Sequence, residues 1–177
     1  MLTESLLTML DVRKAAVRGA LMGGVLEPLD LERFRPLLAG DEGTVAVKMA
    51  FSRDEESRYV IDVAIEADIL AVCQRCLEAM PEHLSSESKL AVVWTDEEAV
   101  SLPRYLDPLI LKEDSCNLWE LVEDELILAM KPFSYHETGT CKRKTVSFFD
   151  PLIKDDVLED KPNPFNVLEQ LKPGNKH

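Results

Sequence analysis

Four residues of this 177-residue chain have the types and the spacing of metal ligands. Cys73 and Cys76 form a Cys-x2-Cys pair, and His136 and Cys141 form a His-x4-Cys pair beyond a long intervening segment. Three thiolates and one imidazole suit tetrahedral zinc. Two intervening residues let both sulfurs of the first pair face one ion, while backbone amides of the turn hydrogen-bond the thiolates. The pattern predicts one structural zinc ion held by Cys73, Cys76, His136 and Cys141.

Two other interpretations of the cysteine pair stay open. A redox dithiol gains support from Arg75, because a neighbouring cation lowers a thiol pKa. Dithiols of the thioredoxin type, however, lie at the N-terminus of a helix, whereas here a strand pattern precedes the pair and Pro81 soon follows it. In the second interpretation Cys73 is a small buried apolar residue at a strand end and His136 is a surface loop residue. Cys116 lies outside both pairs and is expected to be an ordinary thiol.

Other enzyme signatures are missing from the sequence. It has no Gly-rich phosphate loop, no G-x-S-x-G and no His-Glu-x-x-His, and its 7 glycines and 3 histidines limit what could be assembled. The carboxylates of Glu120, Glu123, Asp124 and Glu125 could hold a cation or act as an acid/base pair, but beside an apolar helical stripe they more often form a solvated face. We therefore expect no enzyme.

Alternating apolar residues predict the strands that position the first cysteine pair. Residues 44–51 alternate, residues 52–57 are polar enough for a hairpin loop, and residues 59–69 repeat the period of two and run into Cys73. A weaker third strand follows within residues 83–94. Because successive strands with short connections usually pair, an antiparallel meander is expected.

Two helices are predicted beside this meander. Asp30 as an N-cap, apolar residues at helical spacing and Gly40 as a stop predict a short amphipathic helix. Residues 96–108 show no clear period and are expected to be a loop. Asn117 then caps a second helix that ends before Pro132. The expected fold class is therefore α+β, an antiparallel β-meander packed with a few helices.

Residues 1–141 are expected to form this single domain, and residues 142–177 a mobile tail. The tail contains basic residues, then acids and prolines, with too little apolar surface to fold alone. Within it, a short helix started by a proline presents three apolar residues for docking to a partner. These residues are Phe165, Leu168 and Leu171.

The acidic composition bears on the kind of partner. The net charge is −13, and binding to RNA or DNA depends on cations that displace phosphate counterions, so unaided tight binding to nucleic acid is disfavoured. Basic protein partners fit better, although an acidic surface also simply keeps a protein soluble. The predicted partner surface lies within residues 96–125 and comprises Asp96, Glu97, Glu98, Asp107, Glu113, Asp114, Glu120, Glu123, Asp124 and Glu125. Direct contact with RNA would depend on two small basic groups, Arg13, Lys14 and Arg18 or Lys142, Arg143 and Lys144.

No membrane or export segment is expected. No apolar run approaches the roughly 18 residues of a membrane helix. The first residues include Glu4 and lack a basic region before the apolar residues, which is not typical of a secretory signal. A cytoplasmic location is therefore expected, where cysteines usually remain thiols or metal ligands.

Five stretches of the sequence together resemble the YceD family of bacterial and plastid proteins. They are LDVRKAAVRGALMGGVLEPLDLERF, CQRCLEAM, NLWELVEDELILAMKP, YHETGTC and KPNPFNVLEQLK. The resemblance implies a ribosome-biogenesis factor that supports synthesis, processing or stability of large-subunit (23S) rRNA, without known catalytic activity. The best-marked family positions correspond to Cys73, Arg75, Cys76, Glu123, Glu125, His136 and Cys141. No metal comes with the resemblance, so the zinc ion is inferred from the residues alone.

An acidic protein is expected to affect ribosomal RNA through a protein partner. An acidic surface can bind a basic ribosomal protein, or a pre-50S particle, and suppress non-specific binding of that protein to RNA. Contact with rRNA is then indirect or weak. The alternatives are a factor that binds rRNA directly and, from another class, a Cys-x-x-Cys thiol oxidoreductase.

Overall fold

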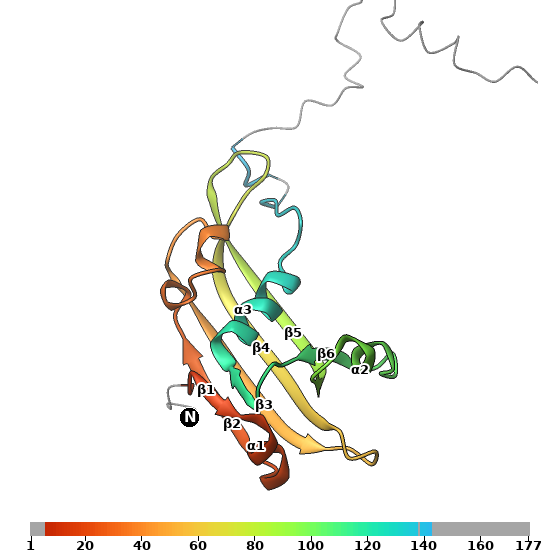
Figure 1. Cartoon of the computed structure of the whole chain (residues 1–177). Helices are drawn as coiled ribbons and strands as arrows, with labels where there is room; N and C mark the ends of the chain where they lie inside the picture. Colours follow the sequence, from red (N-terminus) through yellow and green to blue (C-terminus); the bar gives the residue numbers. More distant parts are fainter. Residues whose placement is uncertain (1–5, 138, 143–177) are drawn as a thin grey trace, which may run out of the picture. The chain divides into compact units, whose positions relative to one another are not determined.

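The computed structural model describes residues 6–137 and 139–142, and these residues form an α+β fold (Figure 1). The elements, in chain order, are β1 (Met9–Asp11), α1 (Val12–Arg18), β2 (Leu21–Leu26), the 3-10 turns η1 (Pro28–Asp30) and η2 (Arg35–Leu37), β3 (Gly43–Arg53), β4 (Tyr59–Val72), β5 (Ala79–Val93), α2 (Asp96–Val100), β6 (Asp107–Ile110), β7 (Ser115–Asn117) and α3 (Leu118–Ala129). Within the described residues, every helix is too short or too polar to span a bilayer.

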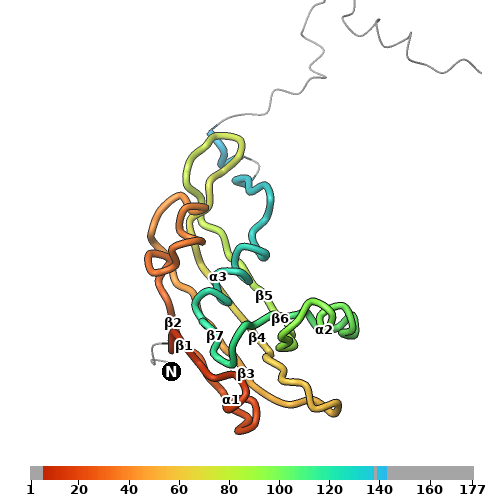
Figure 2. Tube along the Cα trace, viewed as in Figure 1, coloured from red at the N-terminus to blue at the C-terminus, as the bar shows by residue number. Residues whose placement is uncertain are grey.

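The main sheet has the strand order β2-β3-β4-β5-β6. The first four strands are antiparallel neighbours, and β6 runs parallel to β5. The short strands β1 and β7 pair beside it and lead into α1 and α3 (Figure 2). The predicted antiparallel meander is confirmed as β3, β4 and β5, and β2 extends it by one strand.

One face of the sheet is buried beneath α3. Val47 on β3 pairs with Ile65 on β4, and both point to this face with 0–1% of their surface exposed. From α3, Leu118, Val122 and Leu126 pack into the same core cluster. The strict alternation of β3 and β4 leaves every second side chain on the opposite face, where none of the described helices of the main core packs. The sheet therefore has one covered face and one largely open face.

The predicted helix from Asp30 is wrong as an α-helix, because the segment forms two separate 3-10 turns. Pro36 lacks a backbone N–H and disfavours the α conformation of Arg35 before it. Two apolar residues of the segment are nevertheless buried, with Leu31 1% and Phe34 0% exposed, whereas Leu37 is 45% exposed. The predicted loop over 96–108 is also wrong, because it contains α2, which Thr95 caps by accepting the N–H of Glu98, and the start of β6.

The helix predicted from Asn117 is confirmed as α3. The Asn117 side chain accepts the N–H groups of Trp119 and Glu120 at 3.1 and 3.4 Å and donates to the Glu120 carboxylate at 2.9 Å. These bonds satisfy N–H groups that have no partner inside the helix. The helix ends at Ala129, before Pro132.

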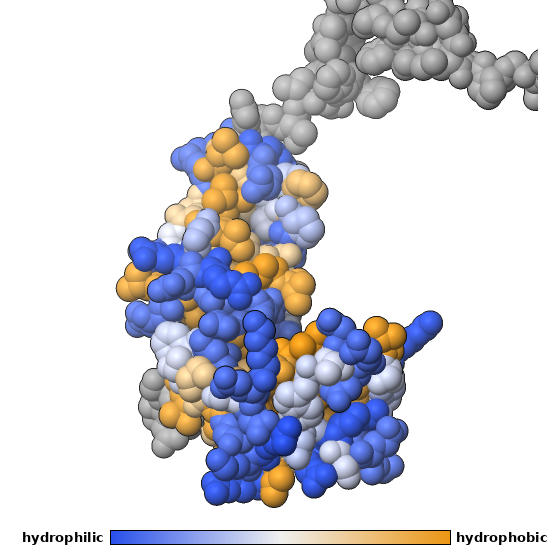
Figure 3. All heavy atoms as spheres, viewed as in Figure 1, coloured by the Kyte–Doolittle hydropathy of each residue, from blue (hydrophilic) through white to orange (hydrophobic). Residues whose placement is uncertain are grey.

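The surface seen from the α3 side is mostly hydrophilic, with hydrophobic residues interrupting it (Figure 3). Large apolar side chains that are exposed include Leu77, Leu128 and Phe133, at 70%, 80% and 68%. The predicted tail, with Phe165, Leu168 and Leu171, lies outside the described residues apart from its first residue, and its boundary and docking helix stay predictions.

Candidate metal centre

The first half of the site is the tight turn that joins β4 to β5. Strand β4 ends at Val72, and Cys73 follows directly. Within the turn, Cys73 donates its N–H to the carbonyl of Glu78 at 2.9 Å, and Leu77 donates to the carbonyl of Cys73 at 2.8 Å. Leu77 closes the turn in the left-handed region, with φ 62°. Such a turn holds the Cys73 and Cys76 sulfurs on the same side of the turn.

The second half arrives on the segment after α3. Gln74 donates its backbone N–H to the carbonyl of Ser134 at 2.9 Å, so this segment runs along the β4–β5 turn. His136 donates its own backbone N–H to the sulfur of Cys73 at 3.5 Å. Figure 1 shows the turn and the end of the described chain meeting at the same end of the sheet.

The four predicted ligands come together there. One ligand atom from each of Cys73, Cys76, His136 and Cys141 lies within 4.8 Å of the others. The Cys76 sulfur lies 3.4 Å from Nδ1 of His136. Cys73 and Cys141 are buried, while the other two are partly exposed. The sequence prediction that these residues form one cluster is confirmed.

The donor set and the spacing fit a tetrahedral ion. Zinc bonds of about 2.0–2.3 Å place neighbouring ligand atoms roughly 3.3–3.8 Å apart, so side-chain shifts of about 1 Å or less bring the cluster to that geometry. Four protein ligands fill every position of a tetrahedral ion, which is typical of structural zinc sites, whereas catalytic sites keep a position for water. The arrangement suits a cross-link between two chain segments better than it suits catalysis.

Backbone amides around the sulfurs favour thiolate. Burial alone would raise the pKa of Cys73, but the N–H groups of Cys76, His136 and Arg75 outweigh it and lower the pKa to about 5. At Cys76, the N–H of Glu78 favours the thiolate, yet burial and the neighbouring sulfurs raise the pKa. Sulfurs this close repel once both are ionised, and a bound cation removes that repulsion.

Side chains around the cluster tie the same two segments together. The guanidinium of Arg75 lies 5.3 Å from the centre of the Tyr135 ring, a cation–π contact that the sequence analysis did not predict. Lys142 pairs with Glu78 at 2.6 Å. Cys116 lies outside the cluster, on β7, where burial and the charge of Glu120 raise its pKa to about 11. A thiol with a raised pKa in an apolar environment is a poor nucleophile and metal ligand.

Two members of the predicted acidic partner surface are buried and not exposed to a partner. Glu123 and Glu125 are only 5% and 8% exposed, because they face the interior side of α3. Glu123 accepts backbone N–H groups of the η1–η2 segment, and Glu125 accepts the hydroxyl of Ser86 at 3.2 Å. The interpretation of this carboxylate cluster as a solvated face therefore fails for Glu123 and Glu125.

The remaining acids of that segment are distributed over several elements. Asp96, Glu97 and Glu98 form the exposed first turn of α2. On α3, Asp124 pairs with Arg33 at 2.7 Å. Asp107 lies on β6, and Glu113 precedes β7.

Three of the six basic residues predicted for RNA contact, Arg13, Lys14 and Lys142, pair with carboxylates. Arg13 pairs with Asp114 at 2.7 Å and lies 4.4 Å from the Trp94 ring. Lys14 pairs with Asp11 at 2.7 Å. Arg18 ends α1, and Arg143 and Lys144 lie outside the described residues.

Comparison with known proteins points to one family. A family model described as large ribosomal RNA subunit accumulation protein YceD matches residues 61–172, which include all four cluster residues. The large ribosomal RNA subunit accumulation protein YceD of Haemophilus influenzae is 29% identical over 143 residues, which cover 80% of this chain and 82% of that protein. No solved structure matches the chain.

Proposed function

Because the chain belongs to the YceD family, we propose that it is a ribosome-biogenesis factor that supports synthesis, processing or stability of large-subunit (23S) rRNA. The observation that carries the proposal is the match of a large ribosomal RNA subunit accumulation family over residues 61–172. The relative of the same name aligns over 80% of the chain, which adds support. The protein acts in the cytoplasm, where thiols stay reduced and ribosomes assemble.

The Cys73, Cys76, His136 and Cys141 cluster binds one structural zinc ion in this proposal. The ion joins the β4–β5 turn to the segment after α3, adding to the main-chain and side-chain contacts between them. Zinc binding to such a site contributes folding free energy directly. The metal therefore keeps the end of the sheet ordered, and the protein needs no enzymatic activity.

The proposed partner is a basic ribosomal protein or a pre-50S particle. A net charge of −13 attracts a cationic protein and repels phosphate. Among the described residues, Arg13, Lys14 and Lys142 are each paired with a carboxylate, which reduces what they can offer to RNA. Contact with rRNA is indirect or weak in this proposal.

A deletion strain tests the rRNA proposal. We expect it to accumulate less large-subunit rRNA relative to small-subunit rRNA, measured by quantitative northern blot and sucrose gradients, and the wild-type gene to restore the ratio. An unchanged ratio in the deletion strain overturns the proposal.

Metal analysis of the purified protein tests the zinc proposal separately. We expect about one zinc per chain in the wild type and in Cys116→Ala, which lies outside the cluster, and none in Cys73→Ser. A chelator should lower the unfolding temperature of the first two proteins. Cooperative unfolding of the metal-free protein at an unchanged temperature overturns the zinc proposal. Turnover in a disulfide-reductase assay would point to a thiol oxidoreductase instead.

A further inference from the structure

The sheet face opposite α3 carries side chains in rows that cross four strands. One row runs Leu21, Ala50, Asp62 and Lys89, from β2 to β5. The next row runs Gly23, Lys48, Ala64 and Glu87, and a third runs Val25, Ala46, Glu66 and Ser85. The β2–β3 half of this open face is thus apolar or small except for Lys48, whereas the β4–β5 half carries acids.

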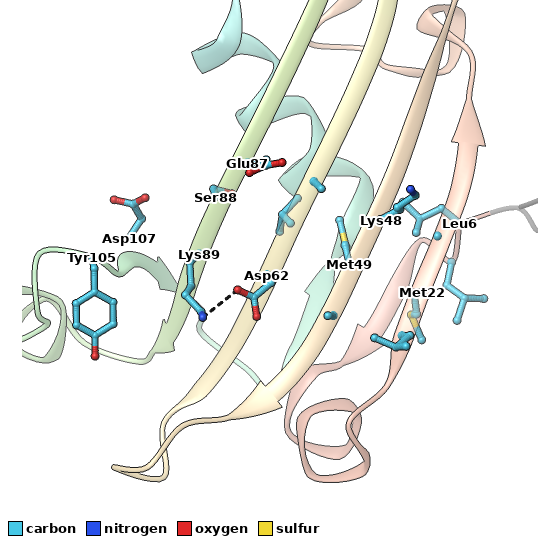
Figure 4. A pocket seen from close by; sticks show the side chains of 16 residues that line it. Leu6, Met22, Lys48, Met49, Asp62, Glu87, Ser88, Lys89, Tyr105 and Asp107 are labelled. Carbon is cyan, nitrogen blue, oxygen red and sulfur yellow. Dashed lines mark ion pairs between the residues drawn. The ribbon is translucent and has the colours of Figure 1, made fainter.

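A groove of about 1200 Å³ lies on this open face. Figure 4 looks onto it with α3 behind the strands, and shows Tyr105 and Asp107 at the β5 margin and Leu6 at the β2 margin. At one corner, Leu106 from the segment after α2 packs on Val60 and Ala91. An apolar side chain from outside the sheet can therefore cover this face. The rest of the face has no such cover among the described residues.

The β2 side of the open face exposes more apolar surface than a solvent-facing sheet normally does. Leu21 is 80% exposed, Val25 49% and the neighbouring Leu7 54%. Antiparallel sheets usually place polar side chains on the face toward water, and contiguous apolar patches mark interaction sites. Gly23 and the alanines of β3 and β4 let a second backbone approach closely.

The β4–β5 side has an excess of negative charge. Asp62 pairs with Lys89 at 3.1 Å, and His83 lies between Glu66 and Asp68 at 2.9 and 2.8 Å. Two further carboxylates of the groove, Glu87 and Asp107, have no ion-pair partner within residues 6–137 and 139–142. An apolar strip therefore lies beside an acidic strip on one surface.

We propose that this open face binds a basic amphipathic helix of a partner protein. The apolar side of the helix lies on β2 and β3, and its lysines and arginines face the acids of β4, β5 and β6. Four strands at about 4.8 Å spacing span roughly 14 Å, which accommodates one helix of about 10–12 Å diameter. The inference rests on the proposed function and gives the basic partner a binding surface on β2–β5, which shares only its margin at Tyr105 and Asp107 with residues 96–125.

Other occupants fit the face less well. An added strand would pair at the edge of the sheet, on the outer side of β2, and not on its face. RNA would bring phosphates toward Asp62, Glu66, Asp68 and Glu87. A helix with both an apolar and a basic side complements both strips at once.

The first test uses the full chain and a synthetic amphipathic peptide of leucines and lysines, with a peptide in which glutamate replaces lysine as the control. We expect the lysine peptide to shift backbone amide NMR signals of β2–β5 on the open face, and to bind at least about tenfold more tightly than the glutamate peptide at low salt. Shifts confined to α2 and α3, or equal binding of both peptides, overturn the inference.

Paired variants sharpen the test. The double variant Leu21→Lys, Glu87→Lys should weaken binding of the lysine peptide about tenfold or more. The control double variant Leu128→Lys, Glu55→Lys makes the same change of charge at exposed residues outside the groove, and should change binding less than about twofold. Circular dichroism should show that each variant is folded like the wild type. Equal effects of the two pairs contradict the inference, because they indicate a response to net charge alone.

Alternative occupants are distinguished in the full chain. Three results would each overturn the inference. Paramagnetic labels could place residues 143–177 on the open face, or the chain could form a dimer that the Leu21→Lys and Glu87→Lys pair breaks. A large-subunit rRNA fragment could also shift the NMR signals of this face. The pair is also introduced into the deletion strain. If wild type restores rRNA accumulation and the pair restores it equally, the proposed function stands and the binding face is wrong.

Discussion

The carboxylate of Glu123 on α3 accepts the backbone N–H of Arg33 at 2.6 Å, across 90 residues of sequence. The same oxygen lies 3.4 Å from the N–H of Phe34, whose side chain is fully buried. One acidic side chain thus anchors the irregular segment before β3 to the helix that covers the sheet.

Replacement of this carboxylate should destabilise the fold. Glu123→Ala leaves buried N–H groups without an acceptor, so we expect the free energy of unfolding to fall by about 1–3 kcal/mol. Glu123→Gln keeps one acceptor oxygen and should lose less. Asp124→Ala is the matched control, since it removes only an exposed ion pair with Arg33 and should cost about 1 kcal/mol or less. Equal losses in urea denaturation would show that the buried bonds to Glu123 contribute nothing special.

The fourth ligand of the cluster can be exchanged for another that zinc accepts. His136→Cys supplies a thiolate in place of the imidazole and should retain about one zinc per chain, because four-cysteine sites are common. His136→Ala leaves three protein ligands. If each ligand contributes on the order of 3 kcal/mol, zinc affinity falls about a hundredfold, which competition with a chromogenic chelator measures. Zinc retention by both variants to the same degree would remove His136 from the ligand set.

Leu77 adopts a backbone conformation that suits glycine, with φ 62°, and its side chain is 70% exposed. Leu77→Gly should therefore raise the free energy of unfolding by about 0.5–1 kcal/mol, because the steric strain disappears while little buried surface is lost. Leu77→Ala keeps the Cβ and should give no such gain. Thermal unfolding of the metal-loaded proteins compares the two, and a loss of stability in Leu77→Gly would indicate that the leucine side chain packs favourably.

The pKa of His83 is raised above its ordinary value of 6.5, chiefly by its hydrogen bond to Asp68, with burial opposing and Glu66 adding a smaller contribution. The folded state favours the imidazolium of His83. Its contribution to the stability of the fold is therefore complete below the pKa of His83 in the unfolded chain, and is lost as pH rises through the pKa in the folded state. Asp68→Asn should lower the pKa of His83 more than Glu66→Gln does, as NMR titration of the imidazole will measure. The reverse order would show that the bond to Asp68 is not the main cause.

Local sequence patterns predicted the elements that neighbouring residues specify by themselves. Alternation over residues 44–51 and 59–69 specified β3 and β4, because a strand with one buried face must alternate. Capping by Asn117 specified the start of α3. Asp11 and Gly19, which cap α1 at its two ends, were also present in the sequence and would have indicated that helix.

Other parts depended on long-range contacts. Strand β2, with Gly23 and Gly24 in its centre, has weak strand propensity by itself and forms because β3 supplies a partner edge. Nothing in the local pattern around Glu123 distinguishes a solvated carboxylate from one that is buried against Arg33 and Phe34.

The sequence by itself determined the donor set of the metal centre, the family and the strands of the central meander, since ligand chemistry and side-chain alternation are properties of neighbouring residues. Tertiary structure decided whether Cys73 and His136 meet, which acids are buried and how Leu21 comes to share a row with Asp62. Those features depend on strand register and on the packing of α3, and both are set by contacts between segments far apart in the chain.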